Sequence, residues 1–317
     1  MAQYLVTGGA GFIGSHLVRA LLARGDRVRV LDDFSSGRLE NLAGLDVEIV
    51  RGSIVDSSVC DRACIGVSGV FHEAAQVSVP RSIEAPRESY AINVTGTLNV
   101  LEACRAARVP RLVFAASSAA YGDTVELPKV ESMPPRPLSP YASGKLAAEE
   151  LLRVYGNLHG MRTVSLRYFN VFGPRQVDDS PYTGVIAIFA RAMLEGRRAT
   201  IFGDGSQTRD MTYIDNVVAA NVAAMQRDLE PGTVVNVGSG ERITILDVYR
   251  AMAELLACDL EPVFAPARAG DVKDSLASID RARDQLGYAP RVGWREGLAR
   301  TVAWYRERLA APPRVGK

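Results

Sequence analysis

The fold of this chain is decided by residues 3–14, QYLVTGGAGFIG. Residues 3–6 are typical of a short apolar strand, and leucines at positions 17, 21 and 22 form the apolar side of a helix that ends near Gly25. The turn between them is rich in glycine. A strand, a glycine-rich turn and a helix in this order begin a nucleotide-binding βαβ unit. We therefore expect a dinucleotide to bind at the turn.

Three glycines of this turn have separate tasks. Gly8 allows a tight turn, Gly11 lets the backbone approach a pyrophosphate, and Gly14 permits close packing of the helix on the sheet. The amide groups at the start of the helix, at Phe12 and Ile13, offer hydrogen bonds and the positive end of the helix dipole to the phosphates. The spacing is GxxGxxG, which differs from the GxGxxG of the general dinucleotide fingerprint.

An acidic residue after the second predicted strand indicates which dinucleotide binds. The strand covers residues 27–31 and is followed by Asp32, 24 residues after Gly8. A carboxylate at this place binds the adenosine ribose and repels a 2′-phosphate. The sequence therefore favours NAD over NADP, although Arg38 nearby is a small argument for the opposite choice.

Strand-like runs alternate with helical segments along the first half of the chain. Further strands are predicted at residues 47–50, 69–72, 111–114 and 163–166. Apolar strands that alternate with helices indicate a parallel sheet covered on both faces. We therefore predict an α/β fold with a Rossmann-type doubly wound parallel sheet. Ligands of such sheets bind beyond the carboxyl ends of the strands, where Ser117 and Asn170 lie.

The pattern becomes irregular after Asn170, where loops rich in glycine, proline and aspartate begin. We expect an NAD-binding domain of residues 1–170, to which the chain returns near residues 210–238. A smaller, discontinuous substrate domain is expected from residues 171–209 and 239–310, followed by a tail of residues 311–317.

Tyr141 and Lys145 give the strongest chemical signal. They lie four residues apart on a predicted helix, so both side chains project from one face. A free tyrosine has a pKa of about 10, and a nearby lysine cation lowers this pKa because it favours the phenolate. The hydroxyl of Ser117 can bridge a substrate hydroxyl and that phenolate. A surface tyrosine and lysine, and a serine that serves its own loop, are the alternatives.

Composition argues against several other classes of protein. The 37 basic residues are balanced by 36 acidic ones, which disfavours a dedicated nucleic-acid-binding protein. No apolar run approaches the roughly 18 residues of a membrane span, and the chain starts directly with its first strand, so a cytoplasmic protein is expected. The 4 cysteines and 3 histidines are dispersed and match no zinc pattern, so no metal site is predicted.

Taken together, the glycine turn, Asp32, Ser117 and the Tyr141/Lys145 pair resemble an extended short-chain dehydrogenase/reductase. More narrowly, they resemble the nucleotide-sugar 4-epimerases that act on UDP-glucose or UDP-N-acetylglucosamine. This resemblance covers nearly the whole chain. It implies NAD as the cofactor, catalytic roles for Ser117, Tyr141 and Lys145, with the last two also binding NAD, and a homodimer.

The resemblance also implies three further contacts to the cofactor, at Ser53, Ile54 and Asn93. The family usually has an acid in place of Ser53, where it contacts adenine. A serine accepts a hydrogen bond less strongly than a carboxylate does. We therefore expect weaker adenine binding at this position.

Several residues match substrate-binding positions of the same family. Arg209 and Arg268 match residues that bind the nucleotide diphosphate, for which the planar guanidinium is well suited. Asn170 matches a residue near the phosphates, and Asp271 one that holds the ribose. Ser275 matches the position where a bulky tyrosine restricts some epimerases to hexoses without an N-acetyl group. The small serine leaves room for that group and also tolerates the smaller glucose.

The residues after Ser117 argue against two related activities. Nucleotide-sugar 4,6-dehydratases carry an Asp-Glu pair there, and glucuronate decarboxylases keep the glutamate. This chain has Ser118 and Ala119, which cannot do the same proton transfers. We therefore predict 4-epimerisation of a UDP-hexose through transient oxidation at C4. A UDP-glucuronate 4-epimerase or a 4-keto-sugar reductase on the same scaffold, and more distantly a non-catalytic NAD-sensing protein, remain alternatives.

Overall fold

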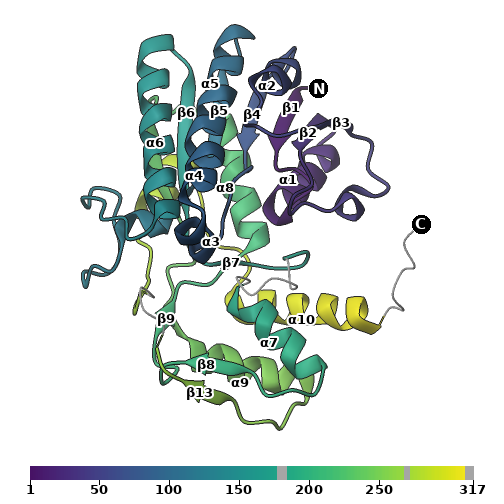
Figure 1. Cartoon of the computed structure of the whole chain (residues 1–317), viewed down its shortest axis with the longest axis vertical. Coiled ribbons are helices and arrows are strands. Elements are labelled where there is room, and N and C mark those ends of the chain that lie inside the picture. Colours follow the sequence, from purple (N-terminus) through teal and green to yellow (C-terminus); the bar gives the residue numbers. More distant parts are fainter. Residues whose placement is uncertain (177–183, 268–271, 311–317) are drawn as a thin grey trace.

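The computed structural model describes residues 1–176, 184–267 and 272–310 of the chain. Figure 1 shows a larger lobe, built around a sheet with helices on both faces, above a smaller lobe that contains α7, α9 and α10. The central sheet is parallel, with strand order β11-β6-β5-β4-β1-β2-β3. The predicted doubly wound α/β fold is confirmed. The strands of this sheet are β1 (Gln3–Thr7), β2 (Arg27–Asp32), β3 (Glu48–Arg51), β4 (Gly69–His72), β5 (Arg111–Ser117), β6 (Arg162–Tyr168) and β11 (Thr233–Val237).

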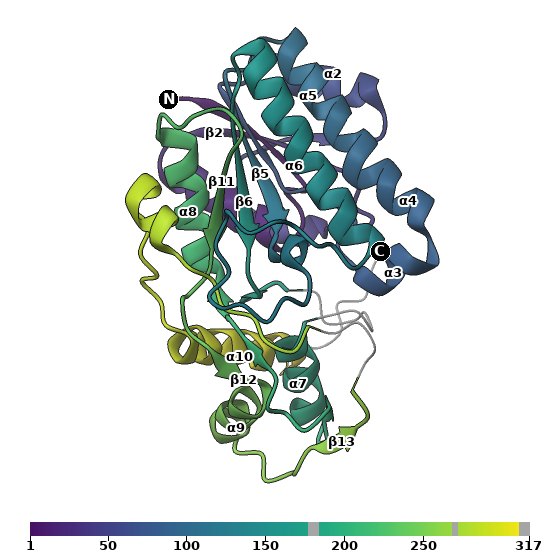
Figure 2. The same cartoon turned by 90° about the vertical axis from the view of Figure 1, so that its left-hand side faces the viewer.

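Long helices cover the two faces of the sheet, as Figure 2 shows. On one face lie α2 (Ser57–Cys64), α5 (Thr97–Ala106) and α6 (Pro140–His159), and on the other lie α1 (Phe12–Ala23) and α8 (Ile214–Gln226). Neighbouring residues of β1 point to opposite faces, because Leu5 and Val6 are both fully buried but belong to different apolar clusters. Each face of the sheet therefore has its own core.

The chain returns to the large sheet after it has entered the smaller lobe. Strand β11 pairs with β6, with Val235 opposite Leu166, and α8 packs against α1. The apolar cluster on this face continues from Val217 of α8 to Phe189 of α7 in the smaller lobe. The two lobes therefore share part of one core.

The smaller lobe combines three helices with short strand pairs. The helices are α7 (Val185–Leu194), α9 (Ile245–Leu256) and α10 (Trp294–Ala310). The strands are β8 (Thr200–Phe202) with β13 (Val263–Ala265), β9 (Thr208–Arg209) with β12 (Ile243–Thr244), and, near the junction of the lobes, β7 (Val171–Phe172) with β10 (Thr212–Tyr213). Short helical segments complete the description: η1 (Leu39–Leu42), α3 (Val79–Glu84), α4 (Pro86–Tyr90), η2 (Ala91–Gly96), η3 (Ser118–Tyr121) and η4 (Ala282–Leu286).

Candidate active site

The glycine turn between β1 and α1 has the geometry that a dinucleotide requires. Gly8 has a φ of +66°, and a Cβ atom there would lie 2.8 Å from the amide nitrogen of Ala74. A Cβ on Gly14 would lie 2.1 Å from the carbonyl oxygen of Gly8. No side chain caps the N-terminus of α1, and no acidic residue lies in its first turn. The turn therefore leaves its amide groups available to an anion, which fits a pyrophosphate.

Asp32 ends β2 beside this turn. Its carboxylate accepts hydrogen bonds from the amide of Ala10 at 2.9 Å and from the amide of Phe34 at 2.8 Å. Burial raises the pKa of Asp32, and these two bonds oppose that rise because they favour the charged form. Asp32 thus fixes the turn against β2. Its contact with a ribose stays a prediction.

The other predicted cofactor residues, Asn93, Ser53 and Ile54, contact neighbouring segments of the chain. Asn93 lies in the π-helical segment η2, and its side-chain amide bonds the amide and the carbonyl of Gln76, both at 2.9 Å. The Ser53 hydroxyl accepts a hydrogen bond from Val55 at 3.3 Å. Ile54 is buried against Gly96, where a Cβ atom would lie 2.6 Å from its Cδ1. Direct contact with a cofactor remains predicted for all three.

Tyr141 and Ser117 meet at the carboxyl edge of the sheet. Helix α6 begins at Pro140, and Ser139 caps it by accepting a hydrogen bond from the amide of Ala142 at 3.2 Å. Tyr141 therefore lies in the first turn of α6. Ser117 is the last residue of β5. Burial raises the pKa of Tyr141, and the nearby Ser117 hydroxyl partly opposes this rise because it can donate a hydrogen bond to the phenolate.

Lys145 is buried one turn further along α6. Its ammonium group donates a hydrogen bond of 2.8 Å to the carbonyl oxygen of Ala115 and lies 4.7 Å from the centre of the Phe114 ring. Burial lowers the pKa of Lys145 to about 8, against an opposing attraction from Glu73. The expected effect of Lys145 on the pKa of Tyr141 stays a prediction. The ammonium group is directed to the backbone of β5.

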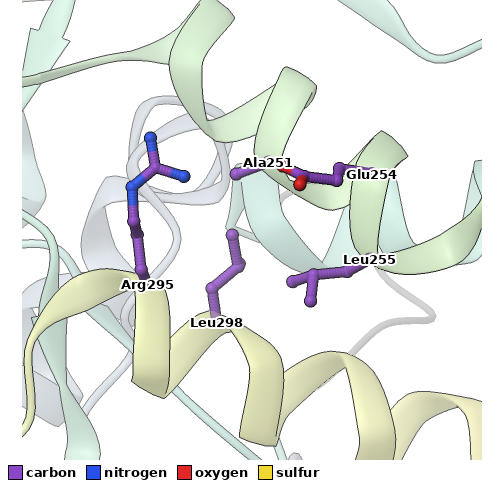
Figure 3. Close-up of a pocket in the computed structure, with 5 residues that line it drawn as sticks. All are labelled: Ala251, Glu254, Leu255, Arg295 and Leu298. Atoms are coloured by element: carbon purple, nitrogen blue, oxygen red, sulfur yellow. The ribbon is translucent and has the colours of Figure 1, made fainter.

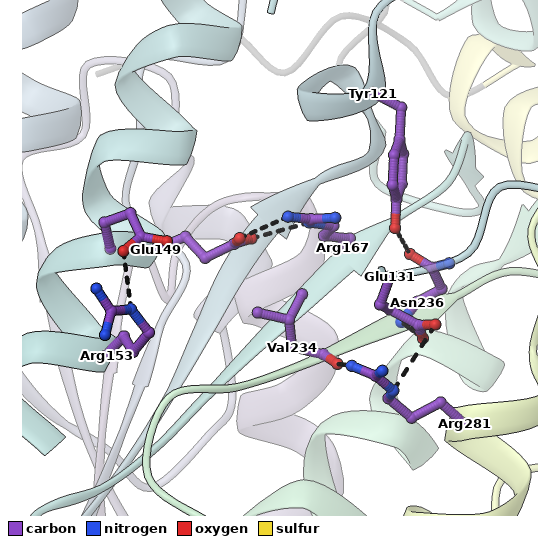
Figure 4. Close-up of polar contacts among 9 residues, drawn as sticks. Tyr121, Glu131, Glu149, Arg153, Arg167, Val234, Asn236 and Arg281 are labelled. Carbon is purple, nitrogen blue, oxygen red and sulfur yellow. Dashed lines mark hydrogen bonds and ion pairs between the residues drawn. The ribbon is translucent and has the colours of Figure 1, made fainter. Parts of the chain in front are cut away.

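A buried polar network supports the loop that follows Ser117, and Figure 4 shows it. The Tyr121 phenol donates a 2.6 Å hydrogen bond to the side chain of Asn236 in β11. The main-chain amide of Asn236 donates to the Glu131 side chain at 2.8 Å, and Glu131 pairs with Arg281 at 3.8 Å. Sequence reasoning did not assign these roles. The segment after Ser117 is therefore tied to β11, the edge strand two positions from β5.

Arg209 and Ser275 lie on adjacent segments of the smaller lobe. The amide of Ser275 donates to the carbonyl of Thr208 at 3.1 Å, and the Arg209 guanidinium donates to the carbonyl of Lys273 at 3.1 Å. The amide of Lys273 donates to Asp123, which follows η3, at 3.3 Å. This contact joins the Ser275 segment to the loop that follows Ser117.

The structure describes one of the three remaining predicted substrate residues. Asn170 is exposed just beyond β6, and its carbonyl accepts a hydrogen bond from Thr212 at 3.0 Å. Arg268 and Asp271 lie outside the described residues. Their assignments therefore rest on the resemblance alone.

A separate pocket lies between α9 and α10 in the smaller lobe (Figure 3). Its walls are mostly aliphatic, with one acid and one base, and are formed by Ala251, Glu254, Leu255, Arg295 and Leu298. None of the predicted site residues lines it. The chemistry described above is concentrated instead at the carboxyl edge of the large sheet.

Two features are absent from the described ranges. No group of three or more histidine, cysteine, aspartate or glutamate side chains in these ranges is arranged to hold a metal ion. In the same part of the chain, no helix has both the length and the apolar character needed to cross a bilayer.

Comparison with known proteins identifies the family. The model of the NAD dependent epimerase/dehydratase family matches residues 4–238. The chain belongs to this family. It is 43% identical over 310 residues to the UDP-glucose 4-epimerase of Mycolicibacterium smegmatis, with 96% of this chain and 98% of the relative covered.

Two solved structures resemble this chain along almost its whole length. UDP-glucose 4-epimerase from Thermotoga maritima with UDP-glucose has a TM-score of 0.93 at 38% identity, with 97% of this chain and 99% of that chain covered. UDP-N-acetylglucosamine 4-epimerase from Methanobrevibacter ruminantium in complex with UDP-N-acetylmuramic acid has a TM-score of 0.93 at 35% identity, with the same coverage. The predicted family is confirmed, and its description agrees with the predicted NAD cofactor. The relatives differ in their sugars.

Proposed function

We propose that this chain catalyses the NAD-dependent 4-epimerisation of a UDP-hexose, either UDP-GlcNAc/UDP-GalNAc or UDP-Glc/UDP-Gal. The observation that carries the proposal is the meeting of Tyr141, Ser117 and Lys145 beside the dinucleotide turn. These three groups can move and hold a proton at a substrate hydroxyl. The similar epimerases named above support the choice of reaction.

The chain's own residues then have the following roles. Tyr141 takes the proton of the C4 hydroxyl, either directly or through the nearby Ser117 hydroxyl. Lys145 supplies a cation at the site, and it has two donors beyond the one bonded to Ala115, which suit the nicotinamide ribose. When bound, NAD would supply the acceptor and later the donor of the C4 hydride. Since hydride is returned in each cycle, we expect the cofactor to stay bound.

Residues of the smaller lobe are proposed to bind the sugar nucleotide. Arg209 provides a guanidinium for the diphosphate of the nucleotide, together with Arg268, and Asp271 is proposed to hold the ribose. The small side chain of Ser275 leaves room beside C2 of the sugar for an N-acetyl group. We propose that residues 171–209 and 239–310 bind the sugar nucleotide, and that residues 1–170 with the return near 210–238 bind NAD.

The proposal is tested by incubating the purified protein separately with UDP-GlcNAc, UDP-glucose and UDP-glucuronate, without added NAD, and resolving the products by NMR. We expect the C4 epimer of at least one of the first two. A reaction with UDP-glucuronate alone would favour the uronate epimerase. Net oxidation of added NADH by a 4-keto sugar would favour the reductase. The absence of any product, even with added NAD, contradicts the proposal.

We further propose a homodimer formed through α5 and α6. Apolar side chains point to solvent on α6, where Val154 and Leu158 are 38% and 72% exposed. Clustered exposed apolar residues of this kind mark interaction surfaces. Light scattering should show a dimer for the wild type and a monomer for Leu158→Glu, and a monomeric wild type at micromolar concentration contradicts the proposal.

A further inference from the structure

Asp210 is a fully buried acid that the proposed steps do not use. It lies between β9 and β10, directly after Arg209. One carboxylate oxygen, Oδ1, accepts hydrogen bonds from the main-chain amide of Ser239 at 2.6 Å and from its hydroxyl at 2.7 Å. The other, Oδ2, accepts from the amides of Gly240 at 3.0 Å and Ala277 at 3.1 Å. All four groups donate, which suits an ionised carboxylate because it only accepts.

The donors to Asp210 come from two segments that are far apart in the sequence. Ser239 and Gly240 belong to the loop that follows β11, an edge strand of the large sheet. Ala277 belongs to the segment that also carries Ser275. A Cβ atom on Gly238 would lie 2.5 Å from the Cβ of Ala277 and 2.8 Å from Oδ2 of Asp210. The carboxylate therefore lies where the end of β11 packs closely against the Ser275 segment.

The Ser275 segment runs beside β9, and Asp210 extends this pairing. The amide of Thr208 donates to the carbonyl of Lys273, and the amide of Ser275 donates to the carbonyl of Thr208, both at 3.1 Å. Thr208 thereby forms a parallel bridge with this segment. Two residues further along each segment, the amide of Ala277 bonds the side chain of Asp210. This bond continues the register that β9 and the Ser275 segment share.

Asn170 is joined to the same carboxylate. The amide of Thr212, the first residue of β10, donates to the carbonyl of Asn170 at 3.0 Å. The hydroxyl of Thr212 bonds Oδ1 of Asp210 at 3.4 Å. Three predicted substrate residues, Asn170, Arg209 and Ser275, are thus linked to Asp210 through short stretches of chain.

We propose that Asp210 is a positioning residue, whose carboxylate holds Asn170, Arg209 and Ser275 together as one substrate-binding wall and anchors this wall to the end of β11. The proposal rests on the function proposed above, since it takes these three residues to bind a UDP-sugar. Strand β11 belongs to the sheet whose glycine turn is proposed to bind NAD. The anchor therefore keeps the sugar in register with the cofactor, and rates of reaction are sensitive to such registers.

A change of one atom in the carboxylate tests this role. Asp210→Asn keeps the size of the side chain but puts an NH2 group where an oxygen accepts hydrogen bonds. We expect the Kd for UDP, measured by calorimetry on the purified protein, to rise at least about tenfold, because two donors then face each other and displace the wall. The NAD content, measured after denaturation, should stay that of the wild type.

The kinetics of Asp210→Asn give a second readout. We expect KM for the accepted UDP-hexose to rise by a larger factor than kcat falls, because the lost interactions orient the substrate. The pH dependence of kcat should keep its shape, since Tyr141 and Ser117 lie on α6 and β5. Asp215→Asn is the matched control. Asp215 is 47% exposed in α8 and pairs with Arg300 at 3.2 Å, so this variant should keep the wild-type KM.

Two milder variants keep the test decisive if Asp210→Asn does not fold. Ser239→Ala removes one side-chain donor and leaves the main-chain bond to Asp210, so UDP should bind less tightly by a smaller factor. Gly238→Ala leaves the carboxylate intact but adds a methyl group against Ala277, which should push the two segments apart and also weaken UDP binding.

The outcomes separate this proposal from the proposed function. UDP affinity that is unchanged in the folded variants overturns the role of Asp210. A parallel loss of UDP affinity and NAD content also overturns it, because it indicates a general loss of structure. A wild type that binds UDP but epimerises no sugar contradicts the proposed reaction and leaves the comparison of UDP affinities valid. A wild type that binds no UDP contradicts both proposals.

Discussion

Lys145 donates a hydrogen bond of 2.8 Å to the carbonyl oxygen of Ala115, which lies two residues before Ser117 on β5. This bond fastens α6 to the strand one helical turn beyond Tyr141. The phenol of Tyr141 and the hydroxyl of Ser117 are consequently held together by a rigid helix on one side and a rigid strand on the other. Sites built on such elements are better ordered than sites on loops.

The first prediction concerns the base. Tyr141→Phe should lower turnover by about 10²–10⁴-fold, because it removes the group that takes the proton. Bound NAD, measured after its release by denaturation, should remain. Tyr90→Phe is the matched control, since the Tyr90 phenol bonds Ser143 on the exposed side of α6 at 3.0 Å. Substantial activity in Tyr141→Phe would remove Tyr141 as the base.

The second prediction concerns Ser117. Ser117→Ala removes the hydroxyl that lowers the pKa of Tyr141, so this pKa should rise. Less phenolate is then present at neutral pH, and the ascending limb of the pH–rate profile should move to higher pH, with a rate loss of about 10–100-fold at pH 7. Ser118→Ala should behave like the wild type. Equal effects of the two substitutions contradict the assignment of Ser117.

The third prediction compares two neighbouring acids of α6. Glu149 accepts hydrogen bonds of 2.6 and 2.9 Å from Arg167, and the two side chains are 5% and 4% exposed. Glu150 pairs with Arg153 at 2.8 Å, where the side chains are 54% and 52% exposed.

Glu149→Gln leaves the Arg167 charge buried and should lower the free energy of unfolding by about 3–5 kcal/mol. Glu150→Gln should lower it by less than about 1 kcal/mol, because water screens that pair. Urea unfolding measures both. Similar losses for the two variants disagree with the burial of the Glu149–Arg167 pair.

The fourth prediction concerns sugar specificity. Ser275→Tyr should reduce kcat/KM for UDP-GlcNAc by at least about tenfold relative to UDP-glucose, because the larger ring fills the space for the N-acetyl group. The main-chain bond from Ser275 to Thr208 does not depend on the side chain, so the variant should fold. Ser275→Ala should keep the original preference. If Ser275→Tyr keeps it too, Ser275 does not control specificity.

The fifth prediction concerns acid stability. His16 and His72 are both largely buried, and burial lowers the pKa of each to about 3. Unfolded histidine has a pKa of about 6.5, so the unfolded chain binds more protons between pH 3 and about 6.5. Their stabilisation is complete above about pH 6.5 and is lost as the pH falls, at about 1.4 kcal/mol per pH unit for each histidine.

Urea unfolding between pH 7 and pH 5 measures this slope. His16→Gln keeps a donor for the carbonyl of Pro174, which His16 bonds at 2.9 Å, and should reduce the slope by about one proton. The same slope in the variant and the wild type would show that His16 takes up a proton in the folded state.

Much of the fold could be predicted because its signals are local. The strand-like runs reappear as β1 to β6, and Ser139 with Pro140 starts the helix that carries Tyr141 and Lys145. The partners of these residues could not be predicted in the same way. Lys145 bonds Ala115 across 30 residues, and Asp123 bonds Lys273 across 150 residues. Such contacts depend on the tertiary arrangement, to which no local pattern points.

The sequence did not draw attention to Glu73, whose carboxyl group accepts a hydrogen bond of 2.9 Å from the Tyr168 phenol, although a signal was present. The rule that drew attention to Ser117 and Asn170, a polar residue directly after a buried strand, applies equally to Glu73 after residues 69–72. What the sequence could not show is that Tyr168, 95 residues away, holds its carboxyl group. Helical spacing likewise placed Tyr141 and Lys145 on one face without fixing where the longer side chain ends, so the bond from Lys145 to Ala115 could not be predicted.

The central claim is that a hydride leaves C4 and returns to the same carbon. The most direct measurement uses the accepted UDP-hexose with deuterium at C4, incubated in ordinary water without added NAD, and follows the product by mass spectrometry and NMR. We predict that the C4 epimer keeps its deuterium at C4, because the proton handled by Tyr141 comes from oxygen and the hydride from carbon. Loss of the deuterium to solvent during epimerisation contradicts the proposed mechanism.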